Sequence, residues 1–141
     1  NPGSGRTLWK TRTPGGAEVV GLGSDGRFVI AGLEEGGVSA FRASTGCFVW
    51  SASVGRDLQD MAPYGRRTRT VFGIPRRIGS RVVFGANDGV LYMLNASDGS
   101  RLAEHPNGGP LSAAPAILGD RIVAASRDGQ LTCFDAVDSK R

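Results

Sequence analysis

The fold is decided by a stretch that occurs twice in the sequence. The first copy reads Ile78-Gly-Ser-Arg-Val-Val-Phe-Gly-Ala-Asn-Asp-Gly-Val-Leu-Tyr-Met-Leu-Asn-Ala96, and the second, 40 residues later, reads Leu118-Gly-Asp-Arg-Ile-Val-Ala-Ala-Ser-Arg-Asp-Gly-Gln-Leu-Thr-Cys-Phe-Asp-Ala136. The two copies align without a gap and are identical at seven positions. A third copy, Val29 to Ala43, lies 53 residues before the first and keeps two glycines and the final alanine. An internal repeat of this length constrains the architecture more than any other feature of a sequence.

Each copy has the pattern of a β-hairpin that continues into further strands. An apolar, β-branched run predicts one strand, and an acidic residue followed by glycine predicts the turn, because glycine adopts positive φ there at little cost. These turn pairs are Glu35-Gly36, Asp88-Gly89 and Asp128-Gly129. Four short strands in roughly 40 residues is the period of a β-propeller blade. We therefore predict an all-β protein of about three four-stranded antiparallel blades, in a ring that is incomplete or completed by another chain.

The strand order predicts one β-propeller segment that spans the whole chain. Residues 1–16 hold the last strand of a blade, 17–54 form blade 1, 55–106 form blade 2, and 107–141 form blade 3 without its last strand. Closed propellers have about four to eight blades, so three blades leave a sheet edge on each side that can pair with another chain. Three arrangements remain open: a fragment of a larger propeller, a homodimer forming a six-bladed ring, or an arc whose edges a protein partner covers.

The first copy, Ile78 to Ala96, and the segment Ala43-Ser-Thr-Gly-Cys-Phe-Val-Trp50 resemble the PQQ-like repeat of quinoprotein-type β-propellers. The resemblance implies that a glycine and a tryptophan at the end of each repeat dock neighbouring blades together. The residues that match these docking positions are Gly5 and Trp9, Gly46 and Trp50, and Gly99. Where a third tryptophan is expected the sequence has Ala103, which predicts a weaker or differently packed junction.

The resemblance also implies a function. Relatives of this kind include the BamB-like lipoproteins of outer-membrane assembly, and bacterial envelope and secreted proteins use the repeat most often. It therefore implies a non-catalytic scaffold or protein-binding module in an extracytoplasmic place. The alternative is a fragment or ancillary propeller of an enzyme, namely a quinoprotein dehydrogenase, a kinase or an adenylate-forming enzyme. Quinoprotein dehydrogenases hold their cofactor against a vicinal Cys-Cys disulfide, but Cys47 and Cys133 are far apart in the sequence, so no cofactor is expected.

An insert separates the first two repeats by 13 residues more than the 40-residue period. Counting from Trp50 makes Pro63 the proline of the first strand in blade 2 and places the insert at about residues 64–77, whereas a competing alignment uses Pro75 and places it at 56–69. The first alignment gathers basic and aromatic residues, namely Tyr64, Arg66, Arg67, Arg69, Phe72, Arg76 and Arg77. Because arginine binds carboxylates and phosphates with paired hydrogen bonds, this cluster is a candidate contact for an anionic partner. A solvated hairpin is the alternative, and nucleic acid is not expected without a recognised binding motif.

Composition agrees with a strand-rich globular chain. The chain has 141 residues, 22 of them glycine, and a net charge of +4 that is suited to an anionic partner without identifying one. No apolar run approaches the roughly 20 residues that a transmembrane helix needs. The two cysteines lie in apolar stretches, so we expect buried, unpaired thiols.

Candidate catalytic and metal-binding residues are few. The acidic residues Glu35, Asp88 and Asp128 recur at one position of the repeat, but turn chemistry accounts for each of them. Glu34 and Glu35 would point to opposite faces of a strand. His105 precedes a loop sequence and is expected to be a surface side chain. We therefore predict no catalytic residue and no metal site.

Overall fold

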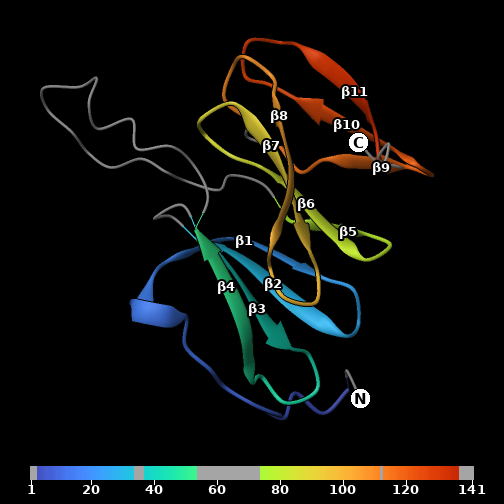
Figure 1. Ribbon diagram of the computed structural model, residues 1–141. Helices are drawn as coiled ribbons and strands as arrows, with labels where there is room; N and C mark the ends of the chain where they lie inside the picture. Colours follow the sequence, from blue (N-terminus) through green and yellow to red (C-terminus); the bar gives the residue numbers. More distant parts are fainter. Residues whose placement is uncertain (1–2, 34–36, 54–73, 112, 137–141) are drawn as a thin grey trace, which may run out of the picture.

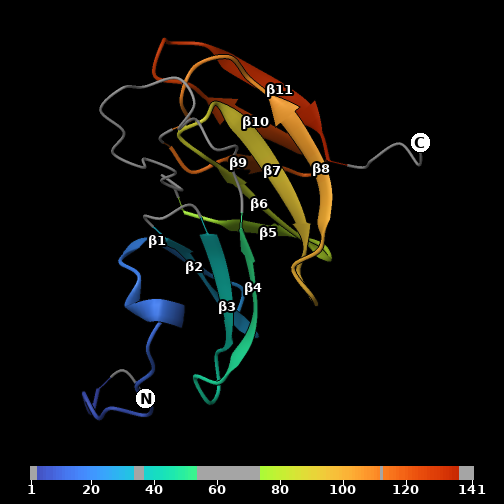
Figure 2. The same ribbon diagram turned by 60° about the vertical axis from the view of Figure 1, so that its left-hand side comes forward.

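Three antiparallel sheets fan out side by side along the chain (Figures 1 and 2). The computed structural model describes residues 3–33, 37–53, 74–111 and 113–136. The strands of blade 1 are β1 (Val19–Ser24), β2 (Phe28–Leu33), β3 (Gly37–Arg42) and β4 (Phe48–Ser53). Those of blade 2 are β5 (Arg76–Ile78), β6 (Arg81–Gly85), β7 (Val90–Asn95) and β8 (Arg101–Pro106), and those of blade 3 are β9 (Ala116–Leu118), β10 (Arg121–Ala125) and β11 (Leu131–Asp135). The prediction of an all-β segment built from propeller blades is confirmed.

Within each blade, every strand pairs antiparallel with the next one along the chain. In the turn between β6 and β7, Gly89 has φ +80° and the backbone N–H of Val90 donates to the Asp88 carboxylate at 3.0 Å. The corresponding turn of blade 3 repeats this arrangement, with Gly129 at φ +88° and the Gln130 N–H at 3.4 Å from Asp128. The acidic residue and the glycine therefore close the turn, which is the role that turn chemistry assigned to them.

Blade 2 is buried on both faces because it packs between the other two blades. Side chains along a strand alternate between faces, so Val82 and Phe84 point to blade 1 whereas Val83 points to blade 3. The core between blades 1 and 2 consists of Phe28, Ile30, Val38, Ala40, Trp50, Val82, Phe84, Ala86, Tyr92, Leu94 and Ala96. The core between blades 2 and 3 consists of Val83, Leu91, Met93, Leu111, Ile122, Ala124 and Ala136. Burial of these two apolar layers is the main force that stacks the sheets.

The connection from blade 2 to blade 3 is tied to the hairpin turns of both. The backbone N–H of Asn107 donates to the Gly89 carbonyl at 2.7 Å, and that of Arg127 donates to the Pro110 carbonyl at 2.9 Å. Leu111 is buried against Gly85, where a Cβ would come within 2.5 Å of the leucine. A side chain at position 85 would therefore displace Leu111 from the core.

The outward face of blade 3 is exposed where the same face of blade 2 is buried. Leu131 is 73% exposed, whereas its counterpart Leu91 is fully buried between blades. Cys133 lies on the same outward face, and Cys47 lies just before β4; both are free and exposed. The expectation of buried thiols was wrong, because in a repeat fold the burial of a strand position depends on which neighbouring blade covers it.

The first strand of blade 2 is set by Pro75. Strand β5 begins at Arg76, directly after this proline, just as β9 begins at Ala116 after Pro115. This is the competing alignment of the sequence, so Arg76 and Arg77 belong to the blade and the expected insert bounds of 64–77 need correction at this end. Proline fits this position because a residue that precedes the paired part of a strand needs no ladder hydrogen bond.

The segment before β1 differs from the sequence-based expectation of a strand within residues 1–16. From residue 3 to residue 18 the only regular element described is the 3-10 turn η1 (Pro14–Gly16). A strand needs a hydrogen-bonded neighbour, and none of the described strands runs beside this segment. Among the described residues there is no helix with the length and apolar character required to cross a membrane.

Candidate functional site

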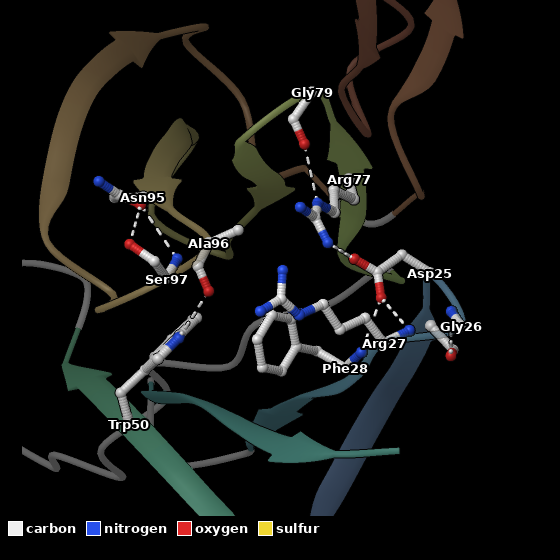
Figure 3. Close-up of polar contacts among 11 residues, drawn as sticks. Asp25, Gly26, Arg27, Phe28, Trp50, Arg77, Gly79, Asn95, Ala96 and Ser97 are labelled. Atoms are coloured by element: carbon white, nitrogen blue, oxygen red, sulfur yellow. Dashed lines mark hydrogen bonds and ion pairs between the residues drawn. The ribbon is translucent and has the colours of Figure 1, made fainter. Parts of the chain in front are cut away.

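The junction between blades 1 and 2 is centred on Trp50. Strand β4 carries this side chain across to blade 2, where its indole N–H donates to the Ala96 carbonyl at 2.9 Å (Figure 3). The ring is 6% exposed and lies against Gly99, where a Cβ would come within 2.4 Å of the indole. Gly99 also has φ +76°, so both the backbone and the contact require glycine. Asn95 orders the adjoining turn by accepting the Ser97 N–H at 3.0 Å.

Trp9 makes the same contact with blade 1. Its indole N–H donates to the Ala43 carbonyl at 2.9 Å, and a Cβ at Gly46 would come within 2.5 Å of its ring. Gly46 has φ +73°, close to the value at Gly99. Gly5, the remaining residue of the predicted docking set, has φ +61° and no other heavy atom within 4 Å of its Cβ position. The tryptophan of one repeat thus packs on the glycine of the next.

A polar clamp of Asp25 and Arg77 also joins blades 1 and 2. The Arg77 guanidinium forms an ion pair with Asp25 and donates from Nε to the Gly79 carbonyl at 2.8 Å (Figure 3). The Arg77 and Arg27 guanidinium groups lie 6.0 and 5.3 Å from the centre of the Phe28 ring. Phe28 is 6% exposed, so its ring fills the junction beneath these cations.

Asp25 is held as a carboxylate by this clamp. Burial acts to raise its pKa, but the Arg77 hydrogen bond and charge and the backbone N–H groups of Phe28 and Arg27 outweigh burial and lower the pKa below 3.8. The two N–H groups donate to Oδ1 at 2.7 and 2.8 Å. Because the pKa is lower in the folded chain than in the unfolded chain, the carboxylate stabilises the fold above its ordinary pKa, and this stabilisation is lost as the pH falls through the folded value.

Asp25→Asn is expected to lower the free energy of unfolding at pH 7 by about 1 kcal/mol, in the range of a charged hydrogen bond that is partly exposed. The difference from the parent chain should be full above the ordinary pKa of 3.8 and should disappear as the pH falls through the lower pKa of the folded chain. Urea denaturation across this range measures it, with Glu18→Gln as an exposed control. A difference that stays constant with pH would contradict the role of the charge.

The junction between blades 2 and 3 uses a different donor. Ala103 occupies the docking position, and the carbonyl of Ala136, the counterpart of Ala43 and Ala96, accepts a hydrogen bond from Nη1 of Arg81 instead. The same nitrogen lies 3.6 Å from the Met93 sulfur. Arg81 comes from the start of β6, whereas the docking tryptophans come from the end of a repeat. A guanidinium therefore replaces an indole as the donor to this carbonyl.

Of the predicted partner-binding residues, the structure describes only Arg76 and Arg77. Tyr64, Arg66, Arg67, Arg69 and Phe72 lie outside the described residues. Arg76 is exposed on β5, and Arg77 is engaged in the clamp. The arginine pair at the end of the expected cluster therefore lies in a strand, and one member of it holds two blades together.

Other titratable residues make contacts within or between the blades. His105 lies near the end of β8, and its half-buried ring packs on Phe134 of blade 3 with centroids 4.9 Å apart. The Tyr92 hydroxyl donates to Asp88, and burial together with this carboxylate raises the tyrosine pKa, which keeps the phenol neutral. Within the described ranges, no group of three or more His, Cys, Asp and Glu side chains is placed to hold a metal ion.

Two functional contacts were missed by reasoning from the sequence, and the alignment of the repeats contained a signal for one of them. Phe28, Arg81 and Arg121 occupy one repeat position, and the change from phenylalanine to arginine coincides with the loss of tryptophan at Ala103. Arg81 could therefore have been recognised as a replacement hydrogen-bond donor for the tryptophan that is absent at position 103. The Asp25–Arg77 pair had no such signal, because the two residues stand at different repeat positions.

Known proteins match both the sequence and the fold of the chain. The family model described as outer membrane protein assembly factor BamB matches residues 1–102 and again residues 71–141. A curated relative, outer membrane protein assembly factor BamB of Burkholderia pseudomallei (strain K96243), is 28% identical over 132 residues, which are 93% of this chain and 31% of the relative. The chain thus spans about a third of that relative.

Solved structures show the same fold. BamB from Moraxella catarrhalis superposes with a TM-score of 0.74 at 18% identity, covering 94% of this chain and 41% of that one. The quinohemoprotein alcohol dehydrogenase ADHIIG from Pseudomonas putida HK5 gives 0.73 at 16% identity, covering 92% of this chain and 20% of that one. These identities establish the fold alone, but the family model covers the whole sequence. The chain therefore belongs to the family described as outer membrane protein assembly factor BamB, and its blades are PQQ-like repeats.

Proposed function

We propose that this chain is part of a non-catalytic β-propeller scaffold that binds other proteins, outside the cytoplasm, in the assembly of outer-membrane proteins. The observation that carries the proposal is the family match, which extends over all three blades. The relative from Burkholderia pseudomallei is named for the same role, and the chain corresponds to 31% of it. The proposal concerns the contribution of these blades to a larger propeller or assembly.

The positions of the polar side chains support a binding role over a catalytic one. Asp88 and Asp128 accept turn hydrogen bonds, Asp25 pairs with Arg77, and His105 packs on an aromatic ring. Each of these groups has a structural task, so none is left in the described part of the chain as an evident acid–base pair. Loops and blade surfaces are then the places where specificity is added to the scaffold.

The insert upstream of β5 remains a prediction of the sequence. We propose that Tyr64, Arg66, Arg67, Arg69 and Phe72 contact an acidic surface of the partner, with the arginines forming paired hydrogen bonds to carboxylates. The exposed Arg76 at the start of β5 extends this basic segment into the blade.

A tagged 141-residue chain is expected to retain outer-membrane assembly proteins from detergent-solubilised membranes of a bacterium that carries a BamB of this family. The triple variant Arg66→Gln, Arg67→Gln and Arg69→Gln should retain roughly tenfold less, because each lost arginine–carboxylate pair weakens binding. The matched control replaces the exposed Arg6, Arg12 and Arg42 with glutamine, which gives the same net charge. Quantitative mass spectrometry of the retained proteins measures both effects.

Three outcomes separate the hypotheses. Equal retention by the two triple variants would remove the role of the insert, and no specific retention by the parent chain would contradict the scaffold. The fold is shared with a quinohemoprotein dehydrogenase, so an enzyme fragment is the second candidate. Oxidation of an alcohol after pyrroloquinoline quinone and Ca²⁺ are added to the same preparation would favour that candidate.

A further inference from the structure

A hollow of about 380 Å³ opens at the junction between blades 2 and 3. It is lined by Ile78, Gly79, Ser80, Arg81, Gly119, Asp120 and Ala136. These residues come from the turn between the first two strands of each blade and from the end of β11. The turns are anchored, because the Ala96 N–H donates to the Ser80 carbonyl at 2.8 Å and the Ala136 N–H to the Asp120 carbonyl at 2.7 Å. The walls of the hollow are therefore fixed parts of the blades.

The corresponding space between blades 1 and 2 is filled by the chain itself. The ring of Phe28 occupies it, and the Arg27 and Arg77 guanidinium groups lie 5.3 and 6.0 Å from the ring centre (Figure 3). Asp25 closes the rim by pairing with Arg77. At the junction between blades 1 and 2, this space is therefore occupied by an aromatic ring that packs against arginine.

The residues that fill this space between blades 1 and 2 have different counterparts between blades 2 and 3. Ile78 replaces Asp25, Ser80 replaces Arg27, and Arg81 replaces Phe28. The place of Arg77 is taken by Ile117, which has no charge to pair across the rim. The second junction therefore lacks the ring and both of its cations, but it has an apolar wall and gains the Arg81 guanidinium at the repeat position of the ring.

We propose that the hollow between blades 2 and 3 binds a phenylalanine or tyrosine side chain of a partner protein, with its ring stacked on the Arg81 guanidinium. The proposal rests on the proposed function and names the side chain through which the partner docks. Arg81 is held in place by the Ala136 carbonyl and the Met93 sulfur, so its planar face is ordered before the ring arrives.

The chemistry of the walls selects an aromatic group. Ile78 and Ala136 belong to the apolar layer between the blades and supply a surface on which a ring is desolvated. Arg81 and Asp120 carry opposite charges at the hollow, so a free anion or cation gains little there, whereas a neutral ring gains the cation–π contact. An aliphatic side chain would bury similar area without that contact.

The probe is N-acetyl-phenylalaninamide, titrated into the ¹⁵N-labelled 141-residue chain with N-acetyl-leucinamide as the matched aliphatic control. Chemical-shift changes are expected at the amides of Gly79, Ser80, Gly119 and Asp120, with a dissociation constant on the order of 1–10 mM for a single side chain. Arg81→Phe places a ring where blade 1 has Phe28 and should abolish the changes. Arg81→Gln removes the cation and should weaken binding several-fold.

Shifts spread away from the hollow, equal shifts with the leucine probe, or shifts that persist in Arg81→Phe would overturn the proposal. If Arg81→Phe fails to fold, the ratio of affinities for the parent chain and Arg81→Gln decides the question, and a ratio near one rejects the stacking. Capture of membrane proteins distinguishes this proposal from the proposed function. Undiminished capture by Arg81→Phe would leave the scaffold in place and remove only the docking site.

Discussion

Trp50→Ala is expected to lower the free energy of unfolding by about 3–5 kcal/mol, the range for truncating a buried aromatic side chain. The substitution opens a cavity between blades 1 and 2 and removes the indole N–H that donates to Ala96 at 2.9 Å. The Ala96 carbonyl, at a residue that is only 2% exposed, then loses the hydrogen bond that it accepts from Trp50 across the junction. Urea denaturation followed by circular dichroism measures the loss.

Trp9→Ala is the matched control for this experiment. Trp9 makes the same hydrogen bond to blade 1, but its side chain is half-buried, so its truncation should cost less than that of Trp50. If Trp50→Ala does not fold, Trp50→Phe can be measured instead, because it keeps an aromatic ring at the junction but removes the N–H donor. An equal or larger loss for Trp9→Ala would contradict the idea that burial between two blades sets the stabilisation.

Gly99→Ala is expected to lower the free energy of unfolding by about 3 kcal/mol, which combines a left-handed backbone with overpacking. The added methyl would lie 2.4 Å from the Trp50 ring, and the residue would have to keep φ at +76°. The control is Gly129→Ala, since Gly129 has φ +88° and nothing within 4 Å of its Cβ position. That variant carries the backbone strain alone and should cost about 1 kcal/mol.

The double variant Trp50→Ala/Gly99→Ala gives the decisive comparison. Once the indole is gone, the methyl at position 99 meets no ring, so Gly99→Ala should cost about as much as Gly129→Ala in that background. Urea denaturation of the four chains yields the coupling energy. Additive losses would show that Gly99 is required by the backbone and that its contact with Trp50 contributes nothing.

Most of the fold could be predicted from the sequence, because its determinants lie close together along the chain. The acidic residue and glycine of each hairpin are adjacent, and the strands they join are local apolar runs. The resemblance to the PQQ-like repeat indicated where the candidate docking residues lie, since Gly46 with Trp50 recurs at the spacing of Gly5 with Trp9. The boundaries of blade 2 could not, because two prolines, Pro63 and Pro75, fitted the repeat spacing and only the pairing of β5 with β6 selects one.

By itself, the sequence determined that the chain is a series of propeller blades, because each repeat carries the strand and turn pattern in its own residues. The docking of tryptophan on glycine was implied by the resemblance to the PQQ-like repeat, and Ala103 takes the place of the tryptophan at the junction of blades 2 and 3. The tertiary structure alone decided how each junction is filled. Asp25 and Arg77 are 52 residues apart, and Arg81 and Ala136 are 55 apart. No local pattern links such residues; they meet because sheet stacking brings the edge of one blade onto the next. The hollow beside Arg81 is likewise visible only when the two junctions are compared in space.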